Sequence, residues 1–372
     1  MTTSTQEQVA AGRAHGAFHP LRVADVERLT ADAVAITFEV PAELRAEYSF
    51  APGQHLTLRA LLDGREVRRS YSICSPPSSG RLRIAVKRLE GGLFSGHALD
   101  QVRVDDVLDV MRPAGRFGVH LDPAGSTHYA AIVAGSGVTP VLSILGAVLE
   151  AEPASRFTLV YGNRDASSVM FLEELADYKD RYPARLQLIH VLSREQRDAE
   201  LLTGRIDVVK LDALLDALIP PDDVDEWLLC GPFEMVEQAR QQLLARGVTN
   251  RQIHLELFHV EGEPLPVRRR SAASGGPIDA DAAEVTVRLD GRTTTFRMPP
   301  EGSVLDATLA VRSDAPFACK GGVCGTCRAR LVEGEVTMAR RYALDDDEVD
   351  DGFVLACQSV PRTAEVVLDF DV

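Results

Sequence analysis

The sequence lacks both the long apolar runs of membrane proteins and the excess of basic residues of nucleic-acid-binding proteins. No apolar stretch approaches the ~20 residues that a helix needs to cross a bilayer. Acidic residues outnumber basic ones by 55 to 40, and the net charge of −15 disfavours binding to a phosphate backbone. The N-terminus shows no apolar signal segment. We therefore expect a cytoplasmic protein with no membrane insertion and no nucleic-acid partner.

Several catalytic patterns are missing as well. We find no H-E-x-x-H zinc motif, no arrangement of Ser, His and Asp typical of hydrolases, and no internal repeat. The hydrophobic content of 45% and the charged content of 26% are typical of a soluble globular protein. A length of 372 residues then indicates two or three domains.

Four of the six cysteines form a pattern that indicates an iron–sulfur cluster. Cys319, Cys324 and Cys327 read as C-x₄-C-x₂-C, and Cys357 follows after a long gap. This is the spacing of plant-type [2Fe–2S] ferredoxins, whose clusters are held by four thiolates. We predict that these four cysteines are the metal ligands.

The residues around the ligands bear on the alternatives. Gly321, Gly322 and Gly325 can take the positive φ values that a loop wrapped around a cluster requires. Zinc is the main rival, but zinc sites usually show two C-x₂-C pairs or Cys/His pairs, and no His lies between the first and last ligand. The same lack of His excludes a Rieske centre. We interpret Cys74 and Cys230 as small buried residues rather than ligands.

The hydrophobic pattern divides the chain into five parts. Residues 1–17 are polar and lack periodicity, which predicts a disordered tail. Short alternating runs over 18–122 predict a small antiparallel barrel, and alternating strands and helices over 123–260 predict an α/β nucleotide-binding domain with a parallel sheet. Residues 261–282 are a linker by composition, and residues 283–372 carry the four cysteines.

The pattern also predicts individual elements. In the barrel we expect strands over 35–40, 55–60 and 82–87. In the α/β domain we expect strands over 129–134, 157–161, 186–192, 226–230 and 253–258. A helix after the first of these strands has one apolar face, formed by Val141, Ile144, Leu145, Val148 and Leu149.

A glycine-containing turn joins that strand to that helix. Gly135 and Gly137 would let the backbone approach a pyrophosphate, and the helix N-terminus would supply N–H groups. Ser136 and Thr139 belong to the same turn, and Pro140 suits an early helix position. The pattern is G-x-G-x-x-P and not the full G-x-G-x-x-G, so a plain tight turn is the alternative.

The order of these parts, together with the sequence Arg69-Ser-Tyr71-Ser72, resembles the ferredoxin–NADP⁺ reductase superfamily over residues 18–372. The resemblance implies a FAD-binding barrel in which Tyr71 packs on the isoalloxazine and Ser72 lies near its reactive nitrogen. Arg69 would neutralise the flavin pyrophosphate, a role that suits a guanidinium group. The alternative for this segment is a half-buried strand with exposed arginines.

The same resemblance implies further FAD contacts after the next strand. Val86 and Lys87 look like the end of that strand, and Gly92-Leu-Phe94-Ser95 looks like the phosphate loop that completes the site.

Other residues resemble the part of the family that surrounds the nicotinamide. Cys230, Gly231 and Pro232 look like the segment beside the nicotinamide ring. Glu256 and Phe258 look like the end of the nucleotide domain, where an aromatic ring shields the flavin until nicotinamide displaces it. For Phe258, plain core packing is the alternative. The implied catalytic residues are thus Tyr71, Ser72, Cys230 and Phe258.

A last group resembles the family segment that grips the 2′-phosphate of NADP. Ser193 and Arg194 follow a predicted strand, and Arg164 follows the neighbouring one. Cationic side chains are what an additional phosphate requires. We therefore expect NADPH as the electron donor, with NADH possible.

The order of FAD barrel, nucleotide domain and C-terminal ferredoxin of β-grasp fold is that of reductase components of multicomponent oxygenases. Several stretches resemble the reductase subunits of phenylacetyl-CoA epoxidases most strongly, and those of steroid hydroxylases and acyl-CoA desaturases less so; they include residues 50–58, 68–74, 161–164 and 318–324. The resemblance implies that hydride passes from NADPH to FAD and that electrons leave singly through the cluster to an oxygenase, expected to be a di-iron enzyme of phenylacetate catabolism. A non-catalytic iron–sulfur flavoprotein sensor or scaffold is the alternative from another class.

One acidic segment has two interpretations. Residues 345–351 hold six acids in seven positions, shortly before the last cysteine. They can form a docking face for a basic partner or the solvated start of a helix, where acids suit the helix dipole. We favour the helix start.

Overall fold

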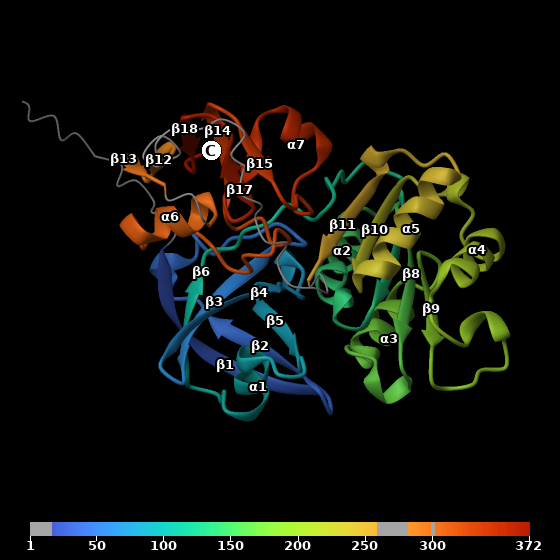
Figure 1. Ribbon diagram of the computed structural model, residues 1–372. Helices are drawn as coiled ribbons and strands as arrows, with labels where there is room; N and C mark the ends of the chain where they lie inside the picture. The colour runs from blue at the N-terminus through green and yellow to red at the C-terminus, as the bar shows by residue number, and fades with distance from the viewer. Residues whose placement is uncertain (1–16, 259–281, 299–301) are drawn as a thin grey trace, which may run out of the picture. The chain divides into compact units, whose positions relative to one another are not determined.

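The computed structural model describes residues 17–258, 282–298 and 302–372, which belong to two compact units (Figure 1). One unit lies within Phe18–Glu263 and the other within Pro264–Val372. The predicted N-terminal tail and the predicted linker lie outside the described residues, except for Ala17 at the end of the tail and Ala282 at the end of the linker. No helix in the described part of the chain is long and apolar enough for a membrane span.

The larger unit begins with an antiparallel sheet of six strands in the order β4-β3-β6-β1-β2-β5. An antiparallel bridge between Ile73, just after β4, and Ile84 of β5 joins the two ends of this order, so the sheet closes into a barrel. Its elements are β1 (Phe18–Thr30), β2 (Ala33–Glu39), β3 (His55–Leu62), β4 (Arg65–Ser72), β5 (Leu82–Lys87), α1 (Leu93–Asp100) and β6 (Val107–Met111).

Alternation along the strands explains the barrel. Leu56 and Leu58 of β3 are fully buried in its core with Ile36 and Ile84 from the other side. The three predicted barrel strands correspond to β2, β3 and β5. The predicted ends of β2 and β3 differ from the observed ends by at most two residues, and those of β5 agree in full. The predicted fold class of this part is confirmed.

The same unit continues as a parallel sheet in the order β11-β10-β7-β8-β9. All five predicted strands are present, although β11 ends one residue before Phe258. The elements are β7 (His128–Ala134), α2 (Val138–Ala151), β8 (Arg156–Asn163), α3 (Leu172–Arg181), β9 (Leu186–Leu192), α4 (Val208–Ala217), β10 (Glu226–Gly231), α5 (Phe233–Ala245) and β11 (Ile253–Leu257).

Helix α2 is buried on more than the one predicted face. Every residue from Val138 to Leu149 is buried, because the sheet covers one side of the helix and the barrel part of the other. Ser143 donates a hydrogen bond to the Ser75 carbonyl, and a side chain at Gly146 would collide with Pro76 and Tyr178. The barrel and the parallel sheet therefore share a packed boundary.

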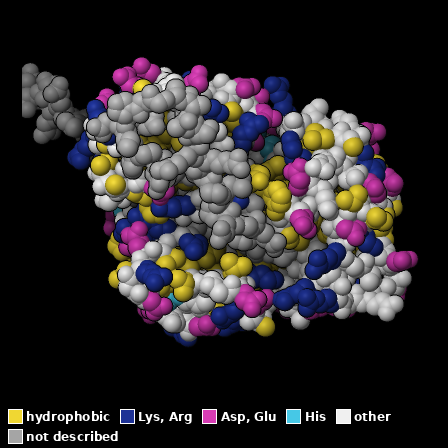
Figure 2. Space-filling view, in the orientation of Figure 1, with side chains coloured by type: hydrophobic (Ala, Val, Ile, Leu, Met, Phe, Trp, Pro, Cys, Tyr) yellow, Lys and Arg dark blue, Asp and Glu magenta, His cyan; other side chains and the backbone are white. Residues whose placement is uncertain are grey.

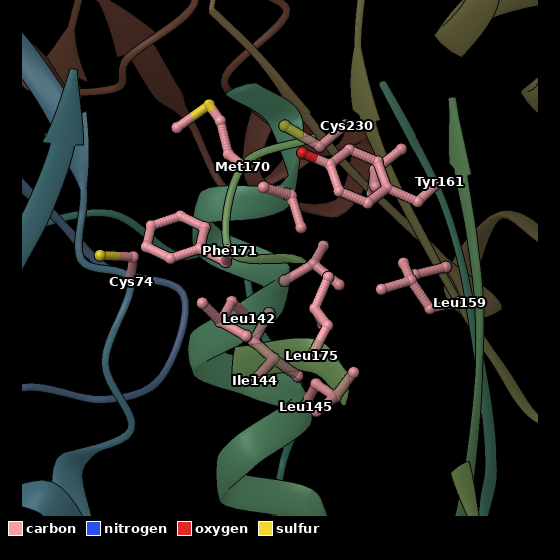
Figure 3. Close-up of a cluster of buried hydrophobic side chains, with 14 of the residues drawn as sticks. Cys74, Leu142, Ile144, Leu145, Leu159, Tyr161, Met170, Phe171, Leu175 and Cys230 are labelled. Atoms are coloured by element: carbon pink, nitrogen blue, oxygen red, sulfur yellow. The ribbon is translucent and has the colours of Figure 1, made fainter. Parts of the chain in front are cut away.

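A large apolar cluster spans this boundary (Figure 3). It includes Cys74 after the barrel strand β4 and Cys230 in β10, both fully buried and free. The prediction that both cysteines are buried is confirmed.

The smaller unit contains a five-stranded mixed sheet in the order β13-β12-β18-β14-β16, in which β12 and β18 are parallel and the other pairs antiparallel. Strands β15 and β17 form a separate antiparallel pair. This is the predicted α+β arrangement, with the elements β12 (Glu284–Leu289), β13 (Arg292–Arg297), α6 (Val304–Val311), β14 (Arg328–Glu333), β15 (Val336–Met338), α7 (Asp346–Asp350), β16 (Phe353–Leu355), β17 (Ser359–Pro361) and β18 (Glu365–Asp369).

The acidic segment forms the start of helix α7. Asp345 is its N-cap, and a capping box with Glu348 satisfies free N–H groups. Glu348 also pairs with Arg328 at 2.9 Å. The helix-start interpretation is confirmed. On the face shown in Figure 2, basic and acidic side chains of the described residues are interspersed.

Candidate active site and cluster site

Three predicted site residues from distant segments meet at the boundary between barrel and parallel sheet. The Ser72 hydroxyl, at the end of β4, donates a hydrogen bond of 3.0 Å to the Glu256 carboxylate. Glu256 in β11 is the register partner of Cys230 in β10. We call Ser72, Glu256 and Cys230 the junction residues.

The environment of the junction residues favours their neutral forms. Burial raises the pKa of Glu256 to about 8, and the hydrogen bond from Ser72 opposes this only in part. Burial, with a smaller contribution from the Glu256 charge, raises the pKa of the Cys230 thiol well above its ordinary value. Near neutral pH Glu256 can therefore hold a proton and give it up.

The glycine turn lies directly against Cys230. A Cβ at Gly137 would lie 2.2 Å from the Cys230 carbonyl oxygen, so only glycine fits there without movement of the backbone. Gly135 has φ of +54°, and its carbonyl accepts a hydrogen bond from the Tyr161 hydroxyl. The Thr139 hydroxyl donates to the Ser136 carbonyl, and Pro140 is the third residue of α2. This narrow turn before a buried helix suits a pyrophosphate.

An amide that sequence reasoning missed lies at the end of strand β8. Asn163 is 9% exposed, and neither polar atom of its side chain has a hydrogen-bond partner in the described structure. Buried polar groups are rarely left unpaired, so an unpaired amide at the carboxyl edge of a parallel sheet fits a site for a polar nucleotide. The signal available in the sequence was the position of Asn163 just after the predicted strand 157–161 and directly before Arg164.

The residues predicted to hold a 2′-phosphate lie at the same edge. The Ser193 N–H donates to the Asn163 carbonyl, and the Arg194 N–H donates to the Arg164 carbonyl at 2.7 Å. Both arginine side chains are exposed. Arg164 forms an ion pair of 2.8 Å with Asp32 of the barrel, whereas Arg194 has no ion-pair partner among the described residues.

The segment Arg69-Ser-Tyr71-Ser72, which we call the flavin sequence, lies on β4. The Tyr71 ring is half-buried and packs on Phe94, with ring centroids 5.5 Å apart. Arg69 is exposed, and its guanidinium donates to the neighbouring Arg68 carbonyl. Arg68 is only 8% exposed, so the alternative of a strand with two exposed arginines is wrong at that position.

Two residues predicted to bind FAD are buried in the barrel core. Val86 is 0% exposed and Phe94 1% exposed, so their side chains belong to the barrel core and only their main chains remain for contact with a ligand. The Ser95 hydroxyl accepts the Leu89 N–H and donates to the Gly92 carbonyl, which fixes the loop. We infer that these residues shape the FAD site and that Tyr71, Ser72 and Arg69 present side chains to it.

Lys87 lies near the glycine turn, and its role at FAD stays a prediction. Its Nζ lies 3.9 Å from the position that a Cβ would take at Gly135, and 3.9 Å from an Asp32 oxygen. The structure thus places this ammonium group beside the nucleotide turn.

Phe258 follows β11 and is 39% exposed. The alternative of plain core packing is therefore wrong. Gly231 ends β10, and Pro232 is the N-cap of α5, so the chain turns sharply beside Cys230. The roles of Phe258, Gly231 and Pro232 stay predictions.

In the smaller unit, the four predicted ligands lie as two pairs. The thiols of Cys319 and Cys324 interact directly, and so do those of Cys327 and Cys357. Within each pair the contact lowers the pKa of one thiol, Cys319 or Cys357, and raises the pKa of the other, Cys324 or Cys327. The choice of iron over zinc rests on the spacing C-x₄-C-x₂-C with a distant fourth cysteine.

Hydrogen bonds reach the sulfurs as a cluster requires. The Gly321 N–H donates to the Cys319 sulfur at 3.3 Å, and the Gln358 amide donates to the Cys357 sulfur at 3.4 Å. Gly322 and Gly325 have positive φ as predicted. The prediction for Gly321 was wrong, because Lys320 takes that conformation instead, with φ of +51°, and its ammonium pairs with Asp306.

Three protein-family models match consecutive parts of the chain. They are the oxidoreductase FAD-binding domain at residues 20–118, the oxidoreductase NAD-binding domain at 131–241 and the 2Fe-2S iron–sulfur cluster binding domain at 287–362. The chain is 46% identical to one subunit of the 1,2-phenylacetyl-CoA epoxidase of Escherichia coli K12 over 355 residues, which cover 95% of this chain and 98% of that protein. The chain belongs to the ferredoxin–NADP⁺ reductase superfamily, in the group with a C-terminal [2Fe–2S] domain.

Other relatives agree with this membership. The reductase is 34% identical to the ferredoxin reductase component of 3-ketosteroid-9-alpha-monooxygenase of Rhodococcus rhodochrous, over 94% of this chain and 96% of that one. Its fold matches crystalline phthalate dioxygenase reductase with a TM-score of 0.55 and 24% identity, over 95% of this chain and 98% of that one.

The reductase is thus an NAD(P)H-dependent iron–sulfur flavoprotein oxidoreductase with FAD, a [2Fe–2S] cluster and a pyridine nucleotide as its cofactors. Each family match lies inside one predicted domain, while the predicted boundaries themselves stay predictions. The non-catalytic alternative has no support in these findings.

Proposed function

We propose that the reductase is the component of a multicomponent oxygenase that takes electrons from NADPH and supplies them singly to the metal centre of a partner protein. One observation carries this proposal: three predicted parts of the site meet. Ser72, from the flavin sequence, bonds to Glu256, which is the register partner of Cys230 in β10, and Cys230 lies against Gly137 of the glycine turn. When bound, FAD accepts a hydride and the cluster accepts single electrons.

The chain's own residues position these groups. Ser72 and Tyr71 would hold the flavin ring, and Arg69 its pyrophosphate. The turn from Gly135 to Pro140 would hold the pyrophosphate of the nucleotide, and its contact with Cys230 would fix where the nicotinamide lies. Glu256 would hold or release a proton beside Ser72.

We propose NADPH as the physiological donor because of the cationic edge. Arg164 and Arg194 emerge from neighbouring strand ends joined by a backbone hydrogen bond. Two guanidinium groups at one edge suit a phosphate dianion, and NADH offers none at that position.

We propose that the partner is a phenylacetyl-CoA epoxidase in phenylacetate catabolism, a di-iron oxygenase, and that both work in the cytoplasm. Support comes from the 46% identity to a component of 1,2-phenylacetyl-CoA epoxidase over nearly the whole of both chains. A steroid hydroxylase is the second candidate, because a relative of that kind is 34% identical over a similar length.

The test uses the purified, cluster-loaded reductase under anaerobic conditions. We expect NADPH to bleach the flavin in a stopped-flow experiment, then to reduce the cluster, with a higher kcat/KM than NADH. Added oxygenase components of a phenylacetyl-CoA epoxidase should then form epoxide in proportion to NADPH consumed. Flavin that stays oxidised with excess NADPH would contradict the catalytic proposal, and turnover only with a steroid hydroxylase would contradict the proposed partner.

A further inference from the structure

A carboxylate of the barrel lies among the cations of the nucleotide site. Asp32 lies in the turn between β1 and β2. One of its oxygens pairs with the Arg164 guanidinium at 2.8 Å, and the other lies 3.9 Å from the Lys87 ammonium. No other carboxylate among the described residues forms an ion pair with either of these cations.

The position of Asp32 is well defined. The Thr30 hydroxyl donates a hydrogen bond of 2.8 Å to the same oxygen that faces Lys87. The Asp32 carbonyl also accepts the Arg88 N–H at 2.8 Å, which ties the turn to the end of β5. Asp32 is 28% exposed, and Lys87 is 20% exposed, so water screens this group only in part.

Both cations belong to the part of the site where phosphates are expected. Lys87 lies beside Gly135 of the nucleotide turn, and Arg164 is joined through its backbone to Arg194. Arg194 is free of ion pairs within the described structure, whereas Arg164 is held by Asp32. Only one nitrogen of the Arg164 guanidinium contacts Asp32, so a phosphate that binds both arginines would share this guanidinium with the Asp32 carboxylate or displace it.

We propose that Asp32 is a specificity-determining residue that competes with the nucleotide 2′-phosphate for Arg164 and limits the affinity for NADP-type nucleotides. This inference rests on the proposed use of NADPH. It adds to that proposal a carboxylate of the protein itself, Asp32, which pairs with Arg164 when no nucleotide is bound.

The ionisation of Asp32 agrees with this role. Burial acts to raise its pKa, but hydrogen bonding from Thr30 and the charges of Lys87 and Arg164 bring the pKa below its ordinary value. The carboxylate is therefore charged at neutral pH, and it repels a phosphate dianion that approaches the same guanidinium. An exposed ion pair contributes about 0.2–1 kcal/mol, and a two- to fivefold change in affinity, about 0.4–1 kcal/mol, lies within this range.

The test measures binding of adenosine 2′,5′-bisphosphate and of adenosine 5′-monophosphate to the oxidised holoprotein by calorimetry at low salt. The variant Asp32→Asn removes the charge and keeps the shape, and Asp32→Ser is a second neutral variant in case the first folds poorly. We expect either variant to bind the bisphosphate about two- to fivefold more tightly than the wild type, and the monophosphate with a smaller gain.

Two controls separate the local effect from net charge. Asp212→Asn removes a carboxylate of α4 with the same 2.8 Å separation from an arginine, here Arg246 at the end of α5, and should leave both affinities unchanged. Asp32→Glu keeps the charge and should stay closer to the wild type than Asp32→Asn. High salt should reduce the gain of the neutral variants.

The outcomes are distinct. Unchanged or weaker binding of the bisphosphate to the neutral variants, or an equal gain for both ligands, would overturn the role of Asp32. If the wild type itself binds the bisphosphate no better than the monophosphate, the proposed preference for NADPH fails instead.

Discussion

The junction between barrel and parallel sheet and the loop around the four cysteines are built in opposite ways. At the junction, Ser72 of the barrel strand β4 meets Cys230 and Glu256 of β10 and β11, more than 150 residues later, and a hydrogen bond and strand register bring them together. In the cluster loop, Cys319, Cys324 and Cys327 come from one short stretch, and only the fourth ligand comes from elsewhere.

The difference determines how each site should respond to damage. A loop that supplies most of its own ligands fails when one ligand is lost, but it need not disturb the rest of the chain. A site assembled by packing has no single essential contact, so a local change should weaken it in proportion to the backbone movement that the change forces. The predictions below test this contrast, beginning with the largest expected effect.

Loss of one cluster ligand should abolish one activity and spare the other. In Cys324→Ser we expect cluster iron and transfer to the oxygenase to fall more than about 100-fold, because a hydroxyl is a poor replacement for a thiolate. NADPH oxidation with ferricyanide should stay within about twofold of the wild type, because its residues belong to the other unit.

Cys74→Ser is the matched control, because Cys74 is buried in the other unit and its thiol donates to the Arg83 carbonyl, as a serine hydroxyl can. It should retain both activities. Coupled oxygenase turnover by Cys324→Ser, measured as product formed per NADPH, would contradict the assignment of the ligand.

A methyl group at the nucleotide turn should have a large but graded effect. The Cβ of Gly137→Ala would lie 2.2 Å from the Cys230 carbonyl oxygen, so the turn must move away from the junction. We expect kcat/KM for NADPH to fall about 10–100-fold, since misplacement of about 1 Å has effects of this size.

Gly96→Ala adds the same group within α1, where the nearest atom is 3.8 Å away, and should change kcat/KM less than about twofold. Equal kinetics of the two variants would show that the close approach of Gly137 and Cys230 has no part in function.

The half-buried acid at the junction should make stability depend on pH. The pKa of Glu256 is raised from 4.5 to about 8, so between these values the native state keeps a proton that the unfolded chain releases. Stability from this group is present below pH 4.5 and is lost as pH rises through 8. Relative to Glu256→Gln, the wild type should lose about 3 kcal/mol between pH 5 and pH 8, measured by urea denaturation.

Glu234→Gln, in the first turn of α5, controls for the change in net charge. Parallel stability curves of the wild type and Glu256→Gln over this pH range would mean that Glu256 ionises normally.

The smallest effect is expected from a hydrogen bond at the cluster. Gln358 donates to the Cys357 sulfur at 3.4 Å, which favours the more negatively charged, reduced cluster. Gln358→Leu should lower the reduction potential by about 20–60 mV, the equivalent of one hydrogen bond for a one-electron couple. A redox titration followed by electron paramagnetic resonance measures this shift, and a potential that rises instead would contradict the argument.

Sequence reasoning succeeded where the signal is local. The spacing of the cysteines, the flavin sequence on β4 and the glycine turn before α2 each lie within a few residues of chain. All five parallel strands were found because each is a short run rich in apolar residues. The long first strand, Phe18–Thr30, was not predicted, because two irregularities in its pairing interrupt the alternation of buried and exposed residues.

The residues that were missed depend on contacts between distant segments. Asp32 occupies a hairpin turn, where aspartate is expected for reasons of turn geometry alone, and nothing near it in the chain indicates Arg164 as its partner. Asn163 was interpreted only as part of a family stretch, since the lack of partners for its amide is a property of the folded protein. The closeness of Lys87 to Gly135 is also a contact between distant segments, while the predicted role of Lys87 at FAD stays a prediction.

The pairing of Cys327 with Cys357 has a consequence for the life of the protein in a cell. A cluster bound by Cys327 and Cys357 would tie together the two ends of the segment between them, which contains β14, β15, α7 and β16, and would stabilise its fold. Iron starvation should therefore expose this stretch to proteases before the barrel is attacked, so that the supply of metal sets the abundance of intact protein as well as its colour.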